Sequence, residues 1–132
     1  IIVNDKGDNI APQKLEGMLT LQPEIAQAMV SGDKRPYMVA LIVPDPEWQK
    51  QWARDHACGA DSGPLAELPE FLKAIKVAVD RTNQELSVIE KIRKFTIADE
   101  AFSVENGQMT PTLKIRRPQI RAAYQGRIDS LY

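Results

Sequence analysis

The sequence is poor in cysteine and histidine, with one of each among its 132 residues. Because an internal disulfide needs two cysteines, Cys58 cannot form one, and a lone cysteine is typical of a reducing compartment. We interpret Cys58 as an incidental thiol rather than a nucleophile. The single histidine, His56, has no partners at the spacing of a metal site, so we predict no metal centre and interpret His56 as structural or exposed.

Long apolar runs and an excess of charge of one sign are also lacking. No stretch approaches the length of a membrane-spanning helix, and no signal peptide is recognisable. We therefore predict a cytoplasmic protein without a transmembrane segment, with peripheral membrane contact left open for a full-length protein. A net charge of −1 gives no overall field that would recruit nucleic acid. The basic run from Lys114 to Arg121 lacks interleaved aromatic residues, so nucleic-acid binding is the weakest functional hypothesis.

What is present is an ordinary globular composition, 43% hydrophobic and 27% charged, at a length that suits one domain with a modest core. Residues 1–3 and 8–10 predict two short strands joined by a turn at Gly7, which tolerates positive φ. A helix is predicted to follow, with Pro12 in its first turn and its end at Pro23. Since the first residue is not methionine, we expect the sequence to be a piece of a longer protein.

Three further segments predict a sheet. Residues 25–30 and 37–43 are apolar and are expected to pair, and residues 95–97 are expected to add a third strand. The second of these is apolar on both faces, so it should be central and covered on both sides. Trp48 and Trp52 lie four residues apart on one helical face and are predicted to pack in the core or against another domain. Helices are predicted to begin at Pro46 and Pro69 and to cover residues 118–132. The expected fold is α+β, a small mostly antiparallel sheet of about three strands flanked by helices, with an N-terminal β-hairpin.

A basic segment follows the turn dipeptide Asn106-Gly107. Residues 109–113 are predicted to form a short extended run, in which Pro111 favours an edge or loop position. Lys114 comes next, with Arg116-Arg117 behind it. A lysine ammonium is a compact charge with three donors, so the segment suits a phosphate or carboxylate partner. Taken alone, however, such a run is most often a solvated surface.

The order of these residues is more specific than their charge. Residues 110–117, Thr-Pro-Thr-Leu-Lys-Ile-Arg-Arg, resemble the C-terminal signature of the adenylate-forming enzymes, whose commoner form is Thr-x-Ser-Gly-Lys-Ile-x-Arg. The Thr-Leu-Lys form is similar to the long-chain fatty acyl-CoA synthetase branch. Thr112 and Leu113 stand where Ser-Gly is usual, so we expect a stiffer loop.

A second signature lies near the start of the chain. Residues 7–16, Gly-Asp-Asn-Ile-Ala-Pro-Gln-Lys-Leu-Glu, resemble the family pattern Gly-x-x-Ile-x-Pro-x-x-(Ile/Leu)-Glu, which begins the small C-terminal domain just after a hinge. The two signatures occur in the family's order and together bracket nearly the whole chain.

The resemblance implies that residues 1–132 are the C-terminal lid domain of an AMP-forming acyl-CoA synthetase, an acid–thiol ligase, without its hinge and large N-terminal domain. That large domain of the same chain would be the partner. It would bind ATP, Mg²⁺ and the fatty acid or other carboxylate substrate, and CoA would accept the acyl group. No cofactor is expected to bind tightly to this part alone.

The resemblance also assigns roles to residues. It implies that Lys114 is the catalytic lysine of adenylation, and that Gly7, Asp8 and Asn9 line the CoA tunnel after the small domain rotates to a second pose. The competing hypothesis is a free-standing binding or regulatory module that keeps the fold without the enzyme. A natural start codon just before Ile1 would identify such a module.

Overall fold

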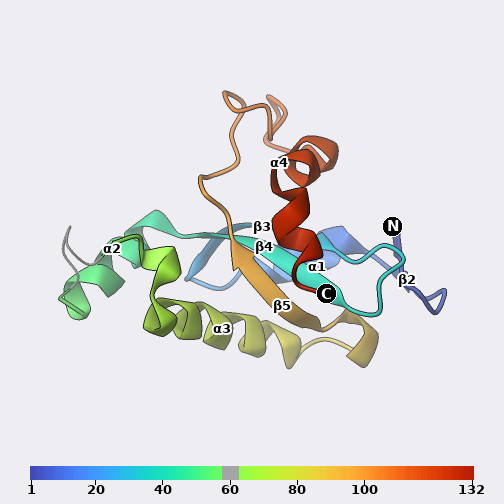
Figure 1. The fold of residues 1–132 in the computed structure, drawn as a ribbon, viewed down its shortest axis with the longest axis horizontal. Coiled ribbons are helices and arrows are strands. Elements are labelled where there is room, and N and C mark those ends of the chain that lie inside the picture. Colours follow the sequence, from blue (N-terminus) through green and yellow to red (C-terminus); the bar gives the residue numbers. More distant parts are fainter. Residues whose placement is uncertain (58–62) are drawn as a thin grey trace.

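The computed structural model describes residues 1–57 and 63–132 and has an α+β fold (Figure 1). The Gly, Asp and Ser residues at positions 58–64 predict a loop, and most of it, including Cys58, lies outside the described residues. The strands are β1 (Ile2–Val3), β2 (Asn9–Ile10), β3 (Ile25–Ser31), β4 (Met38–Pro44) and β5 (Ile92–Ile97). The helices are α1 (Pro12–Leu19), α2 (Pro46–Asp55), α3 (Pro69–Asn83) and α4 (Arg117–Asp129), with short 3-10 turns η2 (Leu65–Glu67) and η3 (Val88–Glu90).

The main sheet has the strand order β3-β4-β5, and β1 and β2 form a separate antiparallel hairpin. β3 pairs with β4 in antiparallel fashion, whereas β5 lies parallel to β4 because the chain crosses back through α2 and α3. The predicted α+β class, with a three-stranded sheet and an N-terminal hairpin, is confirmed, and the sheet is mixed. All residues of β4 are buried, as predicted for a central strand covered on both sides.

Helices cover both faces of this sheet (Figure 1). Successive side chains of a strand point to opposite faces, so Ala40 and Ile42 of β4 join one core cluster and Val39 and Leu41 join the other. The first cluster is completed by α1, α2 and α3, and the second by α4 and the segment before it. The central strand therefore holds two cores together, and α4 is fixed against the face opposite α3.

The aromatic residues of α2 pack as predicted. The ring centroids of Trp48 and Trp52 lie 5.4 and 5.2 Å from that of Phe71 on α3. His56, at the end of α2, stacks on Trp52 with ring centroids 4.0 Å apart, and its Nδ1 lies 2.8 Å from the Trp52 carbonyl oxygen. Asp45 caps the helix by accepting a hydrogen bond from the Trp48 backbone N–H at 3.0 Å.

Some element bounds differ from those predicted. The third strand begins at Ile92 rather than residue 95, because Asn83 exchanges two hydrogen bonds with the backbone of Ile92, at 2.8 and 2.9 Å, and so sets where the strand starts. The last helix ends at Asp129 rather than residue 132, and it kinks at Tyr124, where φ is −122°.

Candidate functional site

The lysine segment forms a tight hairpin over residues 108–116, which we call the lysine loop. Met109 and Ile115 form an isolated bridge, the Thr110 N–H donates to the Lys114 carbonyl at 2.8 Å, and the Arg116 N–H donates to the Gln108 carbonyl at 2.8 Å. The prediction of an extended run over residues 109–113 is therefore wrong. The chain reverses direction there because Pro111 favours the second position of a turn.

The tip of the lysine loop has an unusual backbone. Leu113 has φ of +65°, in the left-handed region, and its N–H donates to the Thr110 carbonyl at 2.8 Å. This is the arrangement of a three-residue hairpin loop, whose left-handed position usually holds glycine. A non-glycine residue there costs about 1–2 kcal/mol. The position that is usually glycine in the family signature thus keeps a glycine-like backbone in this chain.

Side chains brace the same turn from within. The hydroxyl oxygens of Thr110 and Thr112 lie 3.0 Å apart, and the Lys114 N–H donates to the Thr110 hydroxyl oxygen at 3.2 Å. The Lys114 side chain is exposed, and no hydrogen bond or ion pair holds it among residues 1–57 and 63–132. The backbone under Lys114 is therefore fixed, while its ammonium group remains available to a ligand outside the domain.

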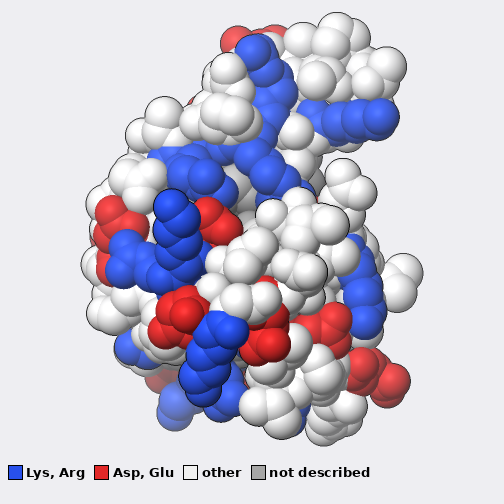
Figure 2. Space-filling view, turned by 90° about the vertical axis from the view of Figure 1, so that its right-hand side faces the viewer, with Lys and Arg blue, Asp and Glu red and all other residues white. Residues whose placement is uncertain are grey.

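The lysine loop projects away from the sheet beside α4 (Figure 1). Positive charge follows it in the sequence, where from Leu113 onward there are five basic residues and one acidic residue, Asp129, whereas Asp99, Glu100 and Glu105 precede it. Figure 2 shows the side of the molecule near the N-terminal hairpin, where Lys and Arg side chains gather in the upper part and acidic side chains are interspersed lower down. This polarity favours an anionic partner near the loop.

A buried ion pair joins the two signatures. Glu16, 8% exposed, ends the first signature, and its Oε2 accepts from Arg117 Nη1 of the second at 2.7 Å. The same oxygen accepts the Val30 backbone N–H at 2.8 Å. Arg117 is the first residue of α4 and follows Lys114 by three positions. The lysine loop is thereby anchored to α1 and β3 at its base.

The hairpin of residues 2–10, which we call the glycine hairpin, carries the other predicted site residues. Gly7 has φ of +85° and no atom lies within 4 Å of where a Cβ would be. Asn4 organises the turn, since its Oδ1 accepts the N–H groups of Lys6 and Asp8 at 3.0 and 2.8 Å. The Asp8 carboxylate accepts from Asn4 Nδ2 at 3.3 Å, and Asn9 is exposed.

The structure brings Gly7, Asp8 and Asn9 together in one turn but does not bring them to Lys114. The glycine hairpin and the lysine loop project from different parts of the domain (Figure 1). Glu16 and Arg117 are the last residues of the first and second signatures, and this position is the only sign of importance that the sequence gives them. The sequence alone assigned neither residue a role. No group of three or more His, Cys, Asp or Glu side chains is placed to hold a metal within the described ranges.

These features are those of a small α+β domain that presents Lys114 and the turn at Gly7 outward on two separate protrusions. A family model described as the AMP-binding enzyme C-terminal domain matches residues 1–132, and the chain belongs to this family. The predicted family is therefore confirmed. No helix among the described residues has the length and apolar character needed to cross a membrane.

Similar proteins agree with this assignment. The chain is 38% identical over 134 residues to long-chain-fatty-acid–CoA ligase FadD15 of Mycobacterium tuberculosis, covering 100% of this chain and 22% of that protein. It is 33% identical over 130 residues to long-chain-fatty-acid–CoA ligase 6 of Homo sapiens, covering 96% of this chain and 19% of that protein. The adenylation domain of a carboxylate reductase from Mycobacterium chelonae has a similar structure, with a TM-score of 0.79 and 26% identity over 100% of this chain and 19% of that one. The chain thus spans about a fifth of the length of these relatives.

Proposed function

We propose that residues 1–132 are the C-terminal domain of an ATP-dependent, AMP-forming acyl-CoA synthetase that activates fatty acids. Family membership and relatives named as long-chain-fatty-acid–CoA ligases support this proposal. The observation that carries it is the exposed Lys114 ammonium on a braced, projecting loop. A cytoplasmic location of the parent enzyme is part of this proposal, and the single cysteine of this domain is compatible with a reducing compartment.

In the first half-reaction, the Lys114 ammonium would stabilise the negative charge that develops in the transition state. A fatty acid carboxylate attacks the α-phosphate of ATP, an acyl–phosphate bond forms, and pyrophosphate leaves. Both reactants are anions, so a preorganised ammonium offsets the charge that develops in the transition state. The large domain of the parent would bind ATP with Mg²⁺ and the fatty acid, and the lysine loop would deliver Lys114 into that site.

In the second half-reaction, the glycine hairpin would face the reaction centre. The thiol of CoA attacks the acyl-adenylate, a thioester forms, and AMP leaves. With no side chain at Gly7 and open space around it, the backbone at this turn leaves room for an extended substrate arm to pass close by. Asp8 and Asn9 would line the same tunnel beside it.

The test of the adenylation role compares two lysine substitutions in the full-length enzyme. Lys114→Ala should slow ATP–pyrophosphate exchange driven by the fatty acid by about 10²–10³-fold, the typical effect of removing one group that stabilises developing charge. Lys73→Ala is the matched control, because Lys73 is also exposed and lies on α3, away from the lysine loop. An equal exchange rate in the two variants would refute the assignment of Lys114.

A further inference from the structure

Two sets of contacts hold the glycine hairpin: Ile2 and Ile10 are buried in the first core cluster, and its backbone is joined to the loop between β3 and β4. Its strands have two residues each, and a hairpin of that size is not stable alone. Residues 32–37 form the connecting loop, and its Lys34 N–H donates to the Val3 carbonyl at 2.7 Å. In return, the Asp5 N–H donates to the Arg35 carbonyl at 3.1 Å, and the Val3 N–H donates to Asp33 Oδ1 at 3.2 Å.

That loop does not hold its shape by local preference. Lys34 has φ of +61°, a left-handed conformation that costs a non-glycine residue about 1–2 kcal/mol. Such a conformation persists only where the surrounding structure determines it. The contacts around this loop therefore also affect where the turn of the glycine hairpin lies.

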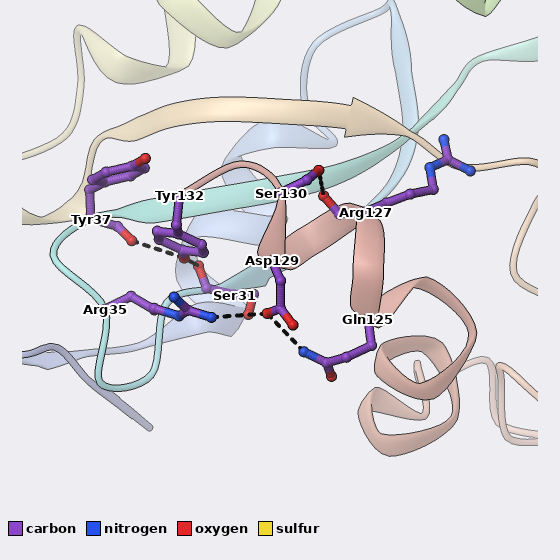
Figure 3. Close-up of polar contacts among 8 residues, drawn as sticks. All are labelled: Ser31, Arg35, Tyr37, Gln125, Arg127, Asp129, Ser130 and Tyr132. Carbon is purple, nitrogen blue, oxygen red and sulfur yellow. Dashed lines mark hydrogen bonds and ion pairs between the residues drawn. The ribbon is translucent and has the colours of Figure 1, made fainter.

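The residues at and after the end of α4 supply those contacts (Figure 3). The Arg35 guanidinium pairs with Asp129 Oδ1 at 3.0 Å and lies over the ring of Tyr132, 4.5 Å from its centroid. The Tyr132 and Tyr37 ring centroids are 4.9 Å apart. We call this group the Tyr132 cluster.

Hydrogen bonds close the Tyr132 cluster around the loop. The Tyr132 hydroxyl lies 3.1 Å from the Tyr37 carbonyl oxygen and 3.3 Å from that of Ser31, at the start of the loop. The Tyr37 hydroxyl donates to the Leu131 carbonyl at 2.6 Å. Burial raises the pKa of Tyr132 to about 12, still further above physiological pH than the ordinary tyrosine value, and its hydroxyl is a hydrogen-bond donor there. Both ends of the loop are thus fixed to the segment that follows α4.

We propose that Tyr132 and Arg35 are positioning residues for the glycine hairpin: they fix the β3–β4 loop, and the loop holds the hairpin in the pose that receives CoA. The second part of this inference rests on the proposed function of the hairpin. The two residues act on the second half-reaction and leave the first unchanged, because the lysine loop is anchored separately by Glu16 and Arg117.

The experiment uses two tyrosine hydroxyls in the full-length enzyme. Tyr132→Phe removes a hydroxyl that touches the loop and keeps the ring under Arg35, whereas Tyr132→Ala removes both. Tyr124→Phe is the matched control, because Tyr124 lies on α4, and its hydroxyl accepts from the Asp99 N–H at 3.1 Å rather than contacting the loop. Hydrogen exchange is measured at the Asp5 and Lys34 amides, which join hairpin and loop.

We expect these two amides to exchange about 5–30-fold faster in Tyr132→Ala, as a loss of one or two kcal/mol would give, with partial rescue in Tyr132→Phe. The KM for CoA should rise about fivefold or more, while adenylation stays within twofold of the unmodified enzyme. Exchange rates equal to those of Tyr124→Phe would overturn the positioning role. Faster exchange with an unchanged KM for CoA would instead support the positioning role and overturn the assignment of the hairpin to CoA.

Discussion

The ion pair between Glu16 and Arg117 is expected to be a principal determinant of the domain's stability. Glu16 is buried and its carboxylate accepts from both Arg117 and the Val30 N–H. Removing one partner of a buried pair costs about 3–5 kcal/mol. The Arg117 side chain is 25% exposed and regains some water, so we expect Glu16→Gln to cost about 2–3 kcal/mol. That is a large share of the roughly 5–15 kcal/mol that stabilises a typical domain.

Urea unfolding of the isolated domain measures this cost through its midpoint, with the slope unchanged. Glu85→Gln is the control, since Glu85 is exposed and should change the free energy of unfolding by no more than about 0.5 kcal/mol. The double variant Glu16→Gln with Arg117→Gln should lose less than the sum of the two single variants, because no buried charge is left unpaired. A Glu16→Gln loss equal to that of the control, or strict additivity in the double variant, would refute the reasoning.

Three further predictions concern the loop, pH and the isolated domain. Leu113→Gly should raise the free energy of unfolding by up to about 1 kcal/mol, because glycine removes the cost of the left-handed φ and the leucine is 71% exposed; a lower urea midpoint would contradict this. The hydrogen bond from Lys14 lowers the pKa of Glu90, so its contribution to stability is full above its unfolded pKa and is lost as pH falls through its folded pKa. Unfolding measured below about pH 4.5 should therefore show a weaker pH dependence in Glu90→Gln, and an unchanged slope would rule out this contribution. The isolated domain should fold, as circular dichroism would detect, yet form no acyl-CoA, because it lacks the large domain that binds ATP; any product from it would overturn this expectation.

The parts of the fold that the sequence predicted are those with a local signal. β4 is apolar on both faces, and this pattern alone placed it at the centre of the sheet. The start of β5 was missed because its residues Arg93 and Lys94 are exposed on an edge strand and carry no apolar run. Its parallel pairing was missed because strand direction depends on the crossover through α2 and α3, which no short motif encodes.

The candidate site likewise contains residues whose conformation has a local sequence signal and residues whose conformation has none. Gly7 was predicted at a left-handed turn because glycine is the residue that tolerates it, whereas Leu113 gave no such signal and the lysine loop was predicted as extended. Glu16 and Arg117 are 101 positions apart, so only the folded chain reveals that one anchors the other. The Tyr132 cluster likewise joins residues of the β3–β4 loop to residues that follow them by more than ninety positions.

The rate of thioester formation from supplied acyl-adenylate and CoA in the full-length Lys114→Ala enzyme tests most directly whether the domain has two functional faces. The account predicts a rate close to that of the unmodified enzyme, because Lys114 and the glycine hairpin act in different half-reactions. A loss as large as the one in adenylation, on the order of 10²–10³-fold, would contradict it.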